Sequence, residues 1–508
     1  MGYRCPSTPN LYIDGLFGYC IAYLLIVKYI TFELGKMFPF LGGKSANFSI
    51  FLDFMERKKQ EITVGFISLG CPKNVVDSER MLAEIVQADF PITAEADNAD
   101  VVVINTCGFI APAEAESLEA IRHAVDRKLS GAVKKVVVAG CLGERLGPKI
   151  HEKVEGIDAV VGLSQRDNIA KIIEKFFSSE IRGRSKDSCP NQPLPPISDR
   201  VVDDRCRLLI TPQHWAYLRI SEGCNHRCSF CTIPEIRGKF RSKPMELVIA
   251  EAEELISAGA VELNVIAQDS TSYGKDLKIK NGLSALLREF DKINNLAWLR
   301  LMYLYPAGID AELIELIANS DKIVHYLDVP FQHVNNQILK SMRRPDKKDK
   351  LQRLIEDLRL AMPDIVLRTT LIVGFPGETD RQFEELLDFV NWARFDALGC
   401  FKFYPESGTA AAELPDQVPD KVKQQRLDAL MVAQQKIAFA KNKDRIGSDL
   451  ACLLDSVDSE GLAKGRYYGQ APDIDSICII EHCSAKPGQF IAAKVIGTQD
   501  YDLLVEQI

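Results

Sequence analysis

From residue 62 onward, short apolar runs of strand length alternate with segments in which apolar residues recur at helical spacing. The first strand-like runs are Ile62 to Ser68, Val101 to Asn105 and Lys135 to Gly140. The helical segments that accompany them are Asp77 to Ala88, Ala113 to Leu129 and Leu142 to Val154. Because strands that alternate with helices favour a parallel sheet, we expect an N-terminal parallel α/β domain over residues 61–177.

The same alternation resumes over residues 213–440. The strand candidates are Tyr217 to Ser221, Val261 to Ala267, Leu299 to Leu304, His325 to Phe331, Val366 to Phe375 and Leu398 to Tyr404. Helical segments include Met245 to Ser257, Ala311 to Ala318, Lys347 to Leu360 and Arg381 to Ala393. Six such units predict a partial (β/α)6 barrel, whose chemistry is expected in the loops after the strands.

The regions outside these two domains have different patterns. Residues 178–212 include Asn191-Gln-Pro-Leu-Pro-Pro196 and are rich in polar residues, which predicts an extended, unpacked linker. Residues 441–508 contain short strand-like runs broken by glycines and by Pro487-Gly488, which predicts a small all-β barrel. The runs are Leu450 to Leu454, Ser476 to Ile480, Phe490 to Ile496 and Tyr501 to Val505.

The first 54 residues read differently from the rest. The apolar stretch from Leu11 to Ile30 contains Asp14 and Lys28, and its uninterrupted part is shorter than the roughly 20 residues that a membrane helix needs. No clear signal-peptide cleavage site follows it. We therefore expect residues 1–54 to be a non-native or unstructured extension, with translation starting at Met55, rather than a membrane anchor.

Composition narrows the class of protein. The chain has 508 residues, of which 46% are hydrophobic and 26% charged, so it is long enough for several globular domains. Its 14 cysteines do not read as the disulfide framework of a small secreted domain and favour metal or redox ligands in the cytoplasm. The net charge of −8 argues against a partner bound mainly through phosphates and suits a basic protein.

Three cysteines in the first barrel loop give the strongest chemical signal, in the run Cys224-Asn-His-Arg-Cys228-Ser-Phe230-Cys231. Three thiolates can hold three irons of a 4Fe-4S cluster and leave the fourth iron free for a small molecule. Structural zinc usually takes four ligands, and His226 is poorly placed to be the fourth. A ferredoxin-like site would supply four cysteines.

A second set of cysteines follows three strands of the N-terminal domain. Cys71, Cys107 and Cys141 each lie within a few residues of the carboxyl end of a predicted strand. Ligands of open parallel sheets bind at that edge, so the three thiols are expected to converge there. The alternative is three separate buried thiols, since free cysteine packs well as a small apolar side chain. Three at one topological position favour a second cluster. No role is predicted for Cys5, Cys20, Cys189, Cys206, Cys400, Cys452, Cys478 and Cys483.

The run Gly374-Phe-Pro-Gly377-Glu378-Thr379 ends the fifth barrel strand. It predicts either a tight turn followed by a helix N-cap at Thr379, or a place where the backbone approaches a cofactor closely.

The spacing CxxxCxxC with an aromatic residue before the last cysteine resembles the signature of the radical S-adenosylmethionine (SAM) superfamily. This resemblance implies that SAM chelates the open iron of the cluster held by Cys224, Cys228 and Cys231. One electron from that cluster would then cleave SAM to a 5'-deoxyadenosyl radical. Gly374, Gly377 and Glu378 become candidate SAM contacts, and no general acid or base is predicted, because the cofactors supply the chemistry.

The three parts together resemble the methylthiotransferase family, in which an N-terminal domain with three cysteines precedes a radical SAM barrel and a C-terminal TRAM barrel. The resemblance covers residues 61–508. Its local sequences are similar to the branch that modifies a ribosomal protein, whereas the transfer RNA branch typically has tyrosine-glycine-cysteine-glutamine at the first cysteine. The matching stretches are Ser68-Leu-Gly-Cys-Pro-Lys-Asn74, Asn105-Thr-Cys-Gly-Phe109, Glu116-Ser-Leu-Glu-Ala-Ile121, Ile220-Ser-Glu-Gly-Cys-Asn-His-Arg-Cys228, Tyr326-Leu-Asp-Val-Pro-Phe-Gln-His333 and Glu413-Leu-Pro-Asp-Gln-Val-Pro419.

This resemblance implies an enzyme that converts an aspartate of small-subunit ribosomal protein number twelve to 3-methylthioaspartate. Cys71, Cys107 and Cys141 would hold an auxiliary 4Fe-4S cluster that handles the inserted sulfur. One SAM would donate the methyl group, and a second would yield the radical that removes hydrogen from the aspartate β-carbon. The alternative of the same class is a transfer RNA (adenosine) methylthiotransferase, and another class is a non-catalytic protein whose metals serve folding.

The expected partners follow from this function. They are a basic ribosomal protein, free or in the assembling small subunit, and an electron donor of flavodoxin or ferredoxin type. Residues 441–508 carry 7 Lys and Arg against 11 Asp and Glu, a difference of −4, which suits a cationic protein better than RNA. We expect neither a membrane partner nor direct nucleic-acid specificity.

Overall fold

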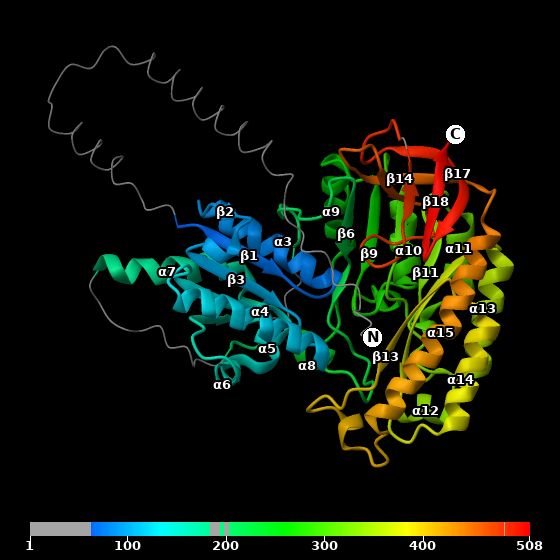
Figure 1. The fold of residues 1–508 in the computed structure, drawn as a ribbon, viewed down its shortest axis with the longest axis horizontal. Coiled ribbons are helices and arrows are strands. Elements are labelled where there is room, and N and C mark those ends of the chain that lie inside the picture. The colour runs from blue at the N-terminus through cyan, green and yellow to red at the C-terminus, as the bar shows by residue number, and fades with distance from the viewer. Residues whose placement is uncertain (1–61, 183–193, 198–202, 482) are drawn as a thin grey trace, which may run out of the picture.

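The computed structural model describes residues 62–182, 194–197, 203–481 and 483–508. They form an N-terminal α/β domain, a central open barrel and a small closed β-barrel at the C-terminus (Figure 1). The predicted N-terminal extension, residues 1–54, lies outside the described part of the chain. No helix among the described residues is long and apolar enough to span a membrane. The three-part fold class expected from the sequence is confirmed.

The N-terminal domain has a five-stranded, fully parallel sheet in the order β2-β1-β3-β4-β5. Its strands are β1 (Val64–Ser68), β2 (Ile92–Thr93), β3 (Val101–Thr106), β4 (Lys135–Ala139) and β5 (Ala159–Val161). Its helices are α3 (Pro72–Gln87), α4 (Ala111–Leu129), α5 (Gly140–Leu146), α6 (Ile150–Lys153) and α7 (Ile169–Arg182). Valines of β3 and β4 are completely buried because helices cover both faces of the sheet.

The largest differences from the predicted helix boundaries in this domain are at the start of α3 and between α5 and α6. Helix α3 begins at Pro72 rather than at Asp77, because Cys71 takes the N-cap position and proline suits the first helical turn. The helix predicted from Leu142 to Val154 is broken between α5 and α6 by Gly147 and Pro148. Strands β2 and β5 were not predicted, because runs of two and three residues show no period.

The central barrel is a six-stranded parallel sheet in the order β13-β12-β11-β10-β9-β6. Its strands are β6 (Trp215–Arg219), β9 (Glu262–Ile266), β10 (Trp298–Leu301), β11 (Ile323–Asp328), β12 (Val366–Val373) and β13 (Ala397–Lys402). Its helices are α8 (Ile233–Arg237), α9 (Met245–Ser257), α10 (Gly282–Phe290), α11 (Ala311–Asn319), α12 (Asn336–Ser341), α13 (Lys348–Ala361), α14 (Asp380–Ala393) and α15 (Asp420–Asp444). A two-stranded hairpin, β7 (Ser221–Glu222) with β8 (Arg241–Ser242), encloses the first loop.

The two faces of the barrel sheet have different chemistry. Leu218, Val265 and Leu301 lie side by side and pack with the helices in the main apolar core. One residue earlier on each strand, Tyr217, Asn264 and Arg300 form a row on the opposite, inner face. The inner face therefore carries polar and charged groups although it is buried.

The C-terminal barrel packs against the amino ends of the central strands. Its strands are β14 (Asp449–Val457), β15 (Ala463–Arg466), β16 (Cys478–Ile480), β17 (Phe490–Gln499) and β18 (Asp502–Gln507). Trp298, at the start of β10, meets Phe490 with ring centroids 4.8 Å apart. Buried Arg466 donates to Glu262 on β9, with 2.6 Å between Nη1 and Oε2. The C-terminal barrel therefore does not cover the carboxyl ends of the strands, where the loops expected to carry the chemistry lie.

The N-terminal domain covers the gap between the two edge strands of the central sheet. Arg219 on edge strand β6 donates to Asp77 of α3 across 2.6 Å. Beyond the other edge strand, β13, Glu406 pairs with Arg145 of α5 at 2.9 Å. Because this domain contacts both edges, it closes the side of the open barrel (Figure 1).

The expected unpacked linker, residues 178–212, differs from the structure at both ends, because α7 continues to Arg182 and the last part of the linker is packed. Asp204 and Arg207 are buried, and Asp204 accepts from Arg219 at 2.6 and 2.9 Å. Residues 183–193 and 198–202 lie outside the described chain. Each of the two charges has partners in both neighbouring domains: Asp204 pairs with Arg80 and Arg219, and Arg207 pairs with Glu79 and Glu251. The proline-rich, polar composition of the linker gives no sign of these contacts.

Replacing Arg466 tests the contact between the C-terminal and central barrels. Arg466→Met leaves Glu262 with Arg300 alone and removes two hydrogen bonds to Asp455. We expect a loss of about 3–5 kcal/mol in the free energy of unfolding, because buried Glu262 loses one of its two arginine partners and Asp455 loses its arginine. Denaturant unfolding measures this, and Lys464→Met, an exposed lysine on the same strand, is the control that should change it little.

Candidate functional site

The loop of Cys224, Cys228 and Cys231 is held closed at its ends and in its middle. Its ends pair through the β7–β8 hairpin, and the Cys224 amide donates to the Gly238 carbonyl at 3.2 Å. Gly223 has φ +78°, and a Cβ there would collide with the Lys239 carbonyl, so glycine is required at this turn. In the middle, the Ser229 amide donates to the Met342 carbonyl at 3.0 Å.

The three thiols of this loop share one partly buried environment. Burial raises the pKa of Cys224 to about 11 and that of Cys231 to about 12, and the nearby Cys228 charge adds to both shifts. Metal ligation requires thiolates, so an iron charge would have to compensate this burial. The donor set therefore fits a cationic iron centre.

His226, which lies between the cysteines, is engaged elsewhere. Its Nε2 lies 2.7 Å from Asp269 Oδ2, and its ring stacks on Tyr305 with centroids 4.0 Å apart. The same tyrosine ring also contacts Arg344, whose Cζ lies 4.2 Å from the Tyr305 ring centroid. These contacts make His226 a wall of the site rather than a fourth ligand.

Cys71, Cys107 and Cys141 come together at one edge of the N-terminal sheet. They follow β1, β3 and β4, which are neighbours in the sheet. Gly70 has φ +94°, and a Cβ there would lie 3.1 Å from Cys107 Sγ, so the first two cysteine loops touch. Burial, followed by the charges of the other two thiols, raises the pKa of Cys107 to about 12.

Neither set has the geometry of a site for a single metal ion. Among the described residues, no three His, Cys, Asp or Glu side chains are grouped to hold one ion. Thiolates bound to three different irons of a cube are spread more widely than ligands around one ion, so cluster ligands need not form such a group.

Arg237 physically links the two cysteine sets. It ends α8, in the same loop as Cys231, and its Nη2 donates to Cys141 Sγ at 3.2 Å. Its Nη1 lies 2.9 Å from Asp77 Oδ2 and 3.1 Å from Glu222 Oε1. The loop of the first set thus reaches a thiol of the second. The sequence offered no signal for this contact, because arginine in a short loop helix is usually solvent-exposed.

Asp77 is the centre of the ion cluster at this junction. It has no solvent exposure and pairs with Arg166, Arg219 and Arg237. Burial alone would raise the pKa of Asp77, but the three arginines outweigh it and hold that pKa far below its usual range. The N-terminal domain and the central barrel are therefore joined through charges that stay ionised.

The glycine-rich run after β12 forms a tight turn, and the contacts within this turn explain why its residues are needed. Buried Glu378 accepts from the Gly374 amide at 2.9 Å and from Arg426 Nη1 at 2.8 Å. A Cβ on Gly374 would collide with Lys423, and Thr379 caps α14 through Gln382. Contact of Gly374, Gly377 or Glu378 with SAM stays a prediction.

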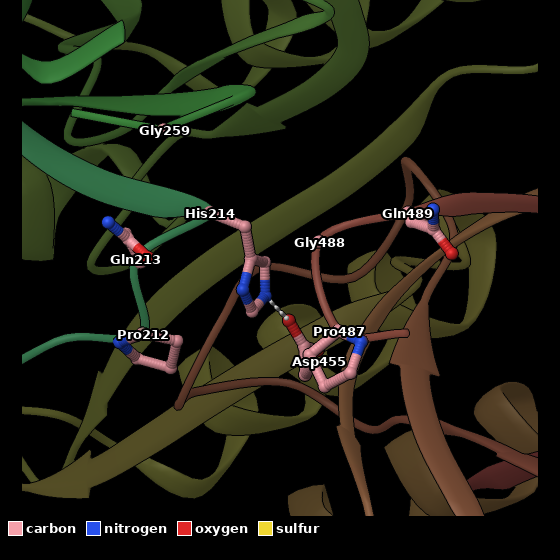
Figure 2. A pocket seen from close by; sticks show the side chains of 8 residues that line it. All are labelled: Pro212, Gln213, His214, Gly259, Asp455, Pro487, Gly488 and Gln489. Carbon is pink, nitrogen blue, oxygen red and sulfur yellow. Dashed lines mark hydrogen bonds and ion pairs between the residues drawn. The ribbon is translucent and has the colours of Figure 1, made fainter. Parts of the chain in front are cut away.

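A separate cavity of about 380 Å³ lies where the central and C-terminal barrels meet (Figure 2). The His214 ring points to Asp455 across it, with 2.8 Å between Nε2 and Oδ1. None of the site cysteines lines it. Its walls are Pro212, Gln213, His214, Gly259, Asp455, Pro487, Gly488 and Gln489.

Comparison with known proteins decides the family. Residues 218–390 match the Radical SAM superfamily, residues 63–162 the "Uncharacterized protein family UPF0004", and residues 446–508 the TRAM domain. A protein of Bdellovibrio bacteriovorus named "Ribosomal protein uS12 methylthiotransferase RimO" is 42% identical over 88% of this chain and 98% of its own length. The protein of the same name from Geobacter sulfurreducens is 42% identical over 89% and 100%. The chain belongs to the RimO family of radical SAM methylthiotransferases.

RimO family membership confirms the resemblance found in the sequence and implies SAM and 4Fe-4S clusters as cofactors. Among solved structures, the radical SAM methyltransferase TsrM from Kitasatospora setae matches with 16% sequence identity and a TM-score of 0.48. The match covers 67% of this chain and 72% of TsrM. The cobalamin-dependent enzyme OxsB matches with 12% sequence identity and a TM-score of 0.45. The match covers 74% of this chain and 57% of OxsB.

Replacing Asp77 tests the junction between the two cysteine sets. Asp77→Asn keeps the shape but removes the fully buried charge that three arginines share and leaves them with Glu222, which is less buried. We therefore expect the free energy of unfolding to fall by about 3–5 kcal/mol. Thermal and denaturant unfolding measure the loss. Glu84→Gln, on the same helix and more exposed, should change stability by less than about 1 kcal/mol. Equal effects of the two variants would contradict the role given to Asp77.

Proposed function

We propose that this chain methylthiolates the β-carbon of an aspartate in ribosomal protein uS12, giving 3-methylthioaspartate. The observation that carries this proposal is the pair of cysteine sets on facing domains, in a chain 42% identical to RimO proteins over nearly their whole length. The relatives reported above carry the RimO name, which favours this reaction over the transfer RNA alternative.

The six cysteines divide between two clusters in this proposal. Cys224, Cys228 and Cys231 would hold the SAM-cleaving cluster, and Cys71, Cys107 and Cys141 would hold the auxiliary one. When bound, the clusters and SAM supply the electron, the radical that removes hydrogen, the sulfur and the methyl group. A radical is needed because the aspartate β-hydrogen is not acidic enough for an ordinary side-chain base.

The protein's own groups position these centres and exclude water. Arg237 donates to Cys141 and, being on the loop of Cys231, fixes one cysteine set relative to the other. His226, stacked on Tyr305, and Arg344 form walls beside the first set. Hydrogen bonds to a thiolate ligand orient it and tune its metal, which assigns Arg237 a positioning role.

The C-terminal barrel is the part that we expect to meet the ribosomal protein. Several of its 11 carboxylates are used within the protein: Asp455 pairs with Arg466, Asp475 accepts from Tyr326, and Asp502 accepts from the Ile477 amide. Residues such as Asp449, Glu460 and Glu506 are exposed. An acidic surface attracts a basic ribosomal protein and repels RNA phosphates. Because ribosomal proteins are made and assembled in the cytoplasm, we infer that the enzyme acts there. We also infer an electron donor of flavodoxin or ferredoxin type, because the SAM-cleaving cluster needs one electron for each cleavage.

Mass spectrometry of uS12 from cells with and without this gene tests the substrate. We expect the methylthio group on its aspartate to disappear in the deletion strain and to return when the gene is restored. Persistence of the modification would exclude this substrate, and loss of a methylthio group from transfer RNA would support the alternative.

Iron analysis of cysteine variants tests the division between clusters. After anaerobic reconstitution we expect about eight irons per chain, and about four in a variant with Cys71, Cys107 and Cys141 changed to alanine. That variant should still cleave SAM but transfer no sulfur. Cys206→Ala, an exposed cysteine without a predicted role, should keep about eight irons. Bound zinc in place of iron would refute radical chemistry.

A further inference from the structure

One lysine beside the auxiliary cysteine set is buried and forms no ion pair with a carboxylate of the described residues. Lys73 stands two residues after Cys71, in the first turn of α3, and the residue is 6% exposed. Its Nζ lies 2.9 Å from the ring centroid of Tyr303. In the described part of the chain, no carboxylate lies within ion-pair distance of Nζ and no acceptor within hydrogen-bond distance. Lysine is almost never buried unless it is paired.

The carboxylate with the largest electrostatic influence on Lys73, that of Asp328, already has two other hydrogen-bond partners. Asp328, at the end of β11, accepts from Arg368 Nη1 at 2.8 Å through one oxygen. Its other oxygen accepts from the Tyr303 amide at 3.2 Å. Asp328 therefore fixes the Tyr303 backbone and balances Arg368, and it leaves Lys73 with a cation–π contact in place of an ion pair.

Lys73 lies beside a short loop that connects the neighbourhoods of the two cysteine sets. The loop after β10 carries Tyr303, which contacts Lys73, and two residues later Tyr305, which stacks on His226. Tyr303 has φ +59°, a strained conformation for a tyrosine and one that concentrates at functional sites. This short loop thus runs from the auxiliary set to the SAM-cleaving set.

We propose that the Lys73 ammonium binds the side-chain carboxylate of the substrate aspartate and so holds its β-carbon between the two cysteine sets. This inference rests on the proposed function, since hydrogen removal and sulfur insertion at one carbon require that carbon to reach both sets. The carboxylate is bonded directly to the β-carbon through Cγ, so an ion pair at Lys73 fixes the carbon that reacts. Lys73 is a specificity residue that selects aspartate over its neutral isostere asparagine.

A two-by-two binding experiment tests this proposal. The reconstituted, SAM-bound full-length enzyme and its Lys73→Met variant are titrated anaerobically with uS12 and with uS12 whose acceptor aspartate is changed to asparagine. We expect Lys73→Met to weaken binding of the aspartate form about 10- to 100-fold, and that of the asparagine form about 2-fold at most, because only the former loses a charge-assisted hydrogen bond. Lys73→Arg should keep part of the discrimination, and the exposed Lys171→Met should keep all of it.

A stability measurement separates this role from a structural one. Because Lys73 has no ion pair, methionine at this position should keep or raise the thermal midpoint while discrimination is lost. Equal weakening for both forms of uS12, unchanged binding of both, or a loss of SAM affinity in Lys73→Met would each overturn the proposal. So would a shifted auxiliary-cluster spectrum with discrimination intact. If wild-type enzyme neither binds nor modifies uS12, the proposed function fails instead.

Discussion

The relative position of the two cysteine sets depends on one buried carboxylate, Asp77. The sets belong to different domains, so no backbone element fixes the distance between them. Asp77 on α3 accepts from Arg219 of the barrel edge and from Arg237 of the cysteine loop, and Glu222 shares both arginines. Buried ion pairs add little net stability, since desolvation offsets much of the attraction. Their geometry, however, is satisfied by one placement of the two domains, and a reaction at a single carbon needs that placement.

This constraint also explains the charged interior of the barrel. Parallel strands covered on both faces usually read as continuous apolar runs, and the side that faces the helices follows this rule. The inner side is covered by two other domains rather than by helices of its own. Arg300 and Arg466 share Glu262 at the C-terminal barrel, while Arg219 meets Asp204 at the linker. The interior charges are thus inter-domain contacts, which make the three parts depend on one another.

Much of this architecture could be predicted from the sequence, because strands such as β3 are short continuous apolar runs and helices such as α14 carry apolar residues at helical spacing. The convergence of Cys71, Cys107 and Cys141 followed from topology alone, since each comes after a strand of one parallel sheet. Arg237 and Lys73 could not be found in this way. Their importance lies in which distant groups they do or do not contact, and local pattern carries no information about residues more than 90 positions away, such as Cys141 from Arg237.

The two cations beside the auxiliary cysteines illustrate how stability and function divide. Arg237 is saturated by Asp77, Glu222 and Cys141, so its burial is compensated within the folded chain. Lys73 forms no ion pair with the described residues, and burial lowers its pKa to about 8. A stem of the same length without charge would fill the same space at no desolvation cost, so folding alone gives no reason for an ammonium there. A group that destabilises the free enzyme and lies beside the reacting centre is what differential binding requires, because Cys71, Asp328 and Glu222 compensate its charge only in part and a bound substrate carboxylate completes the compensation.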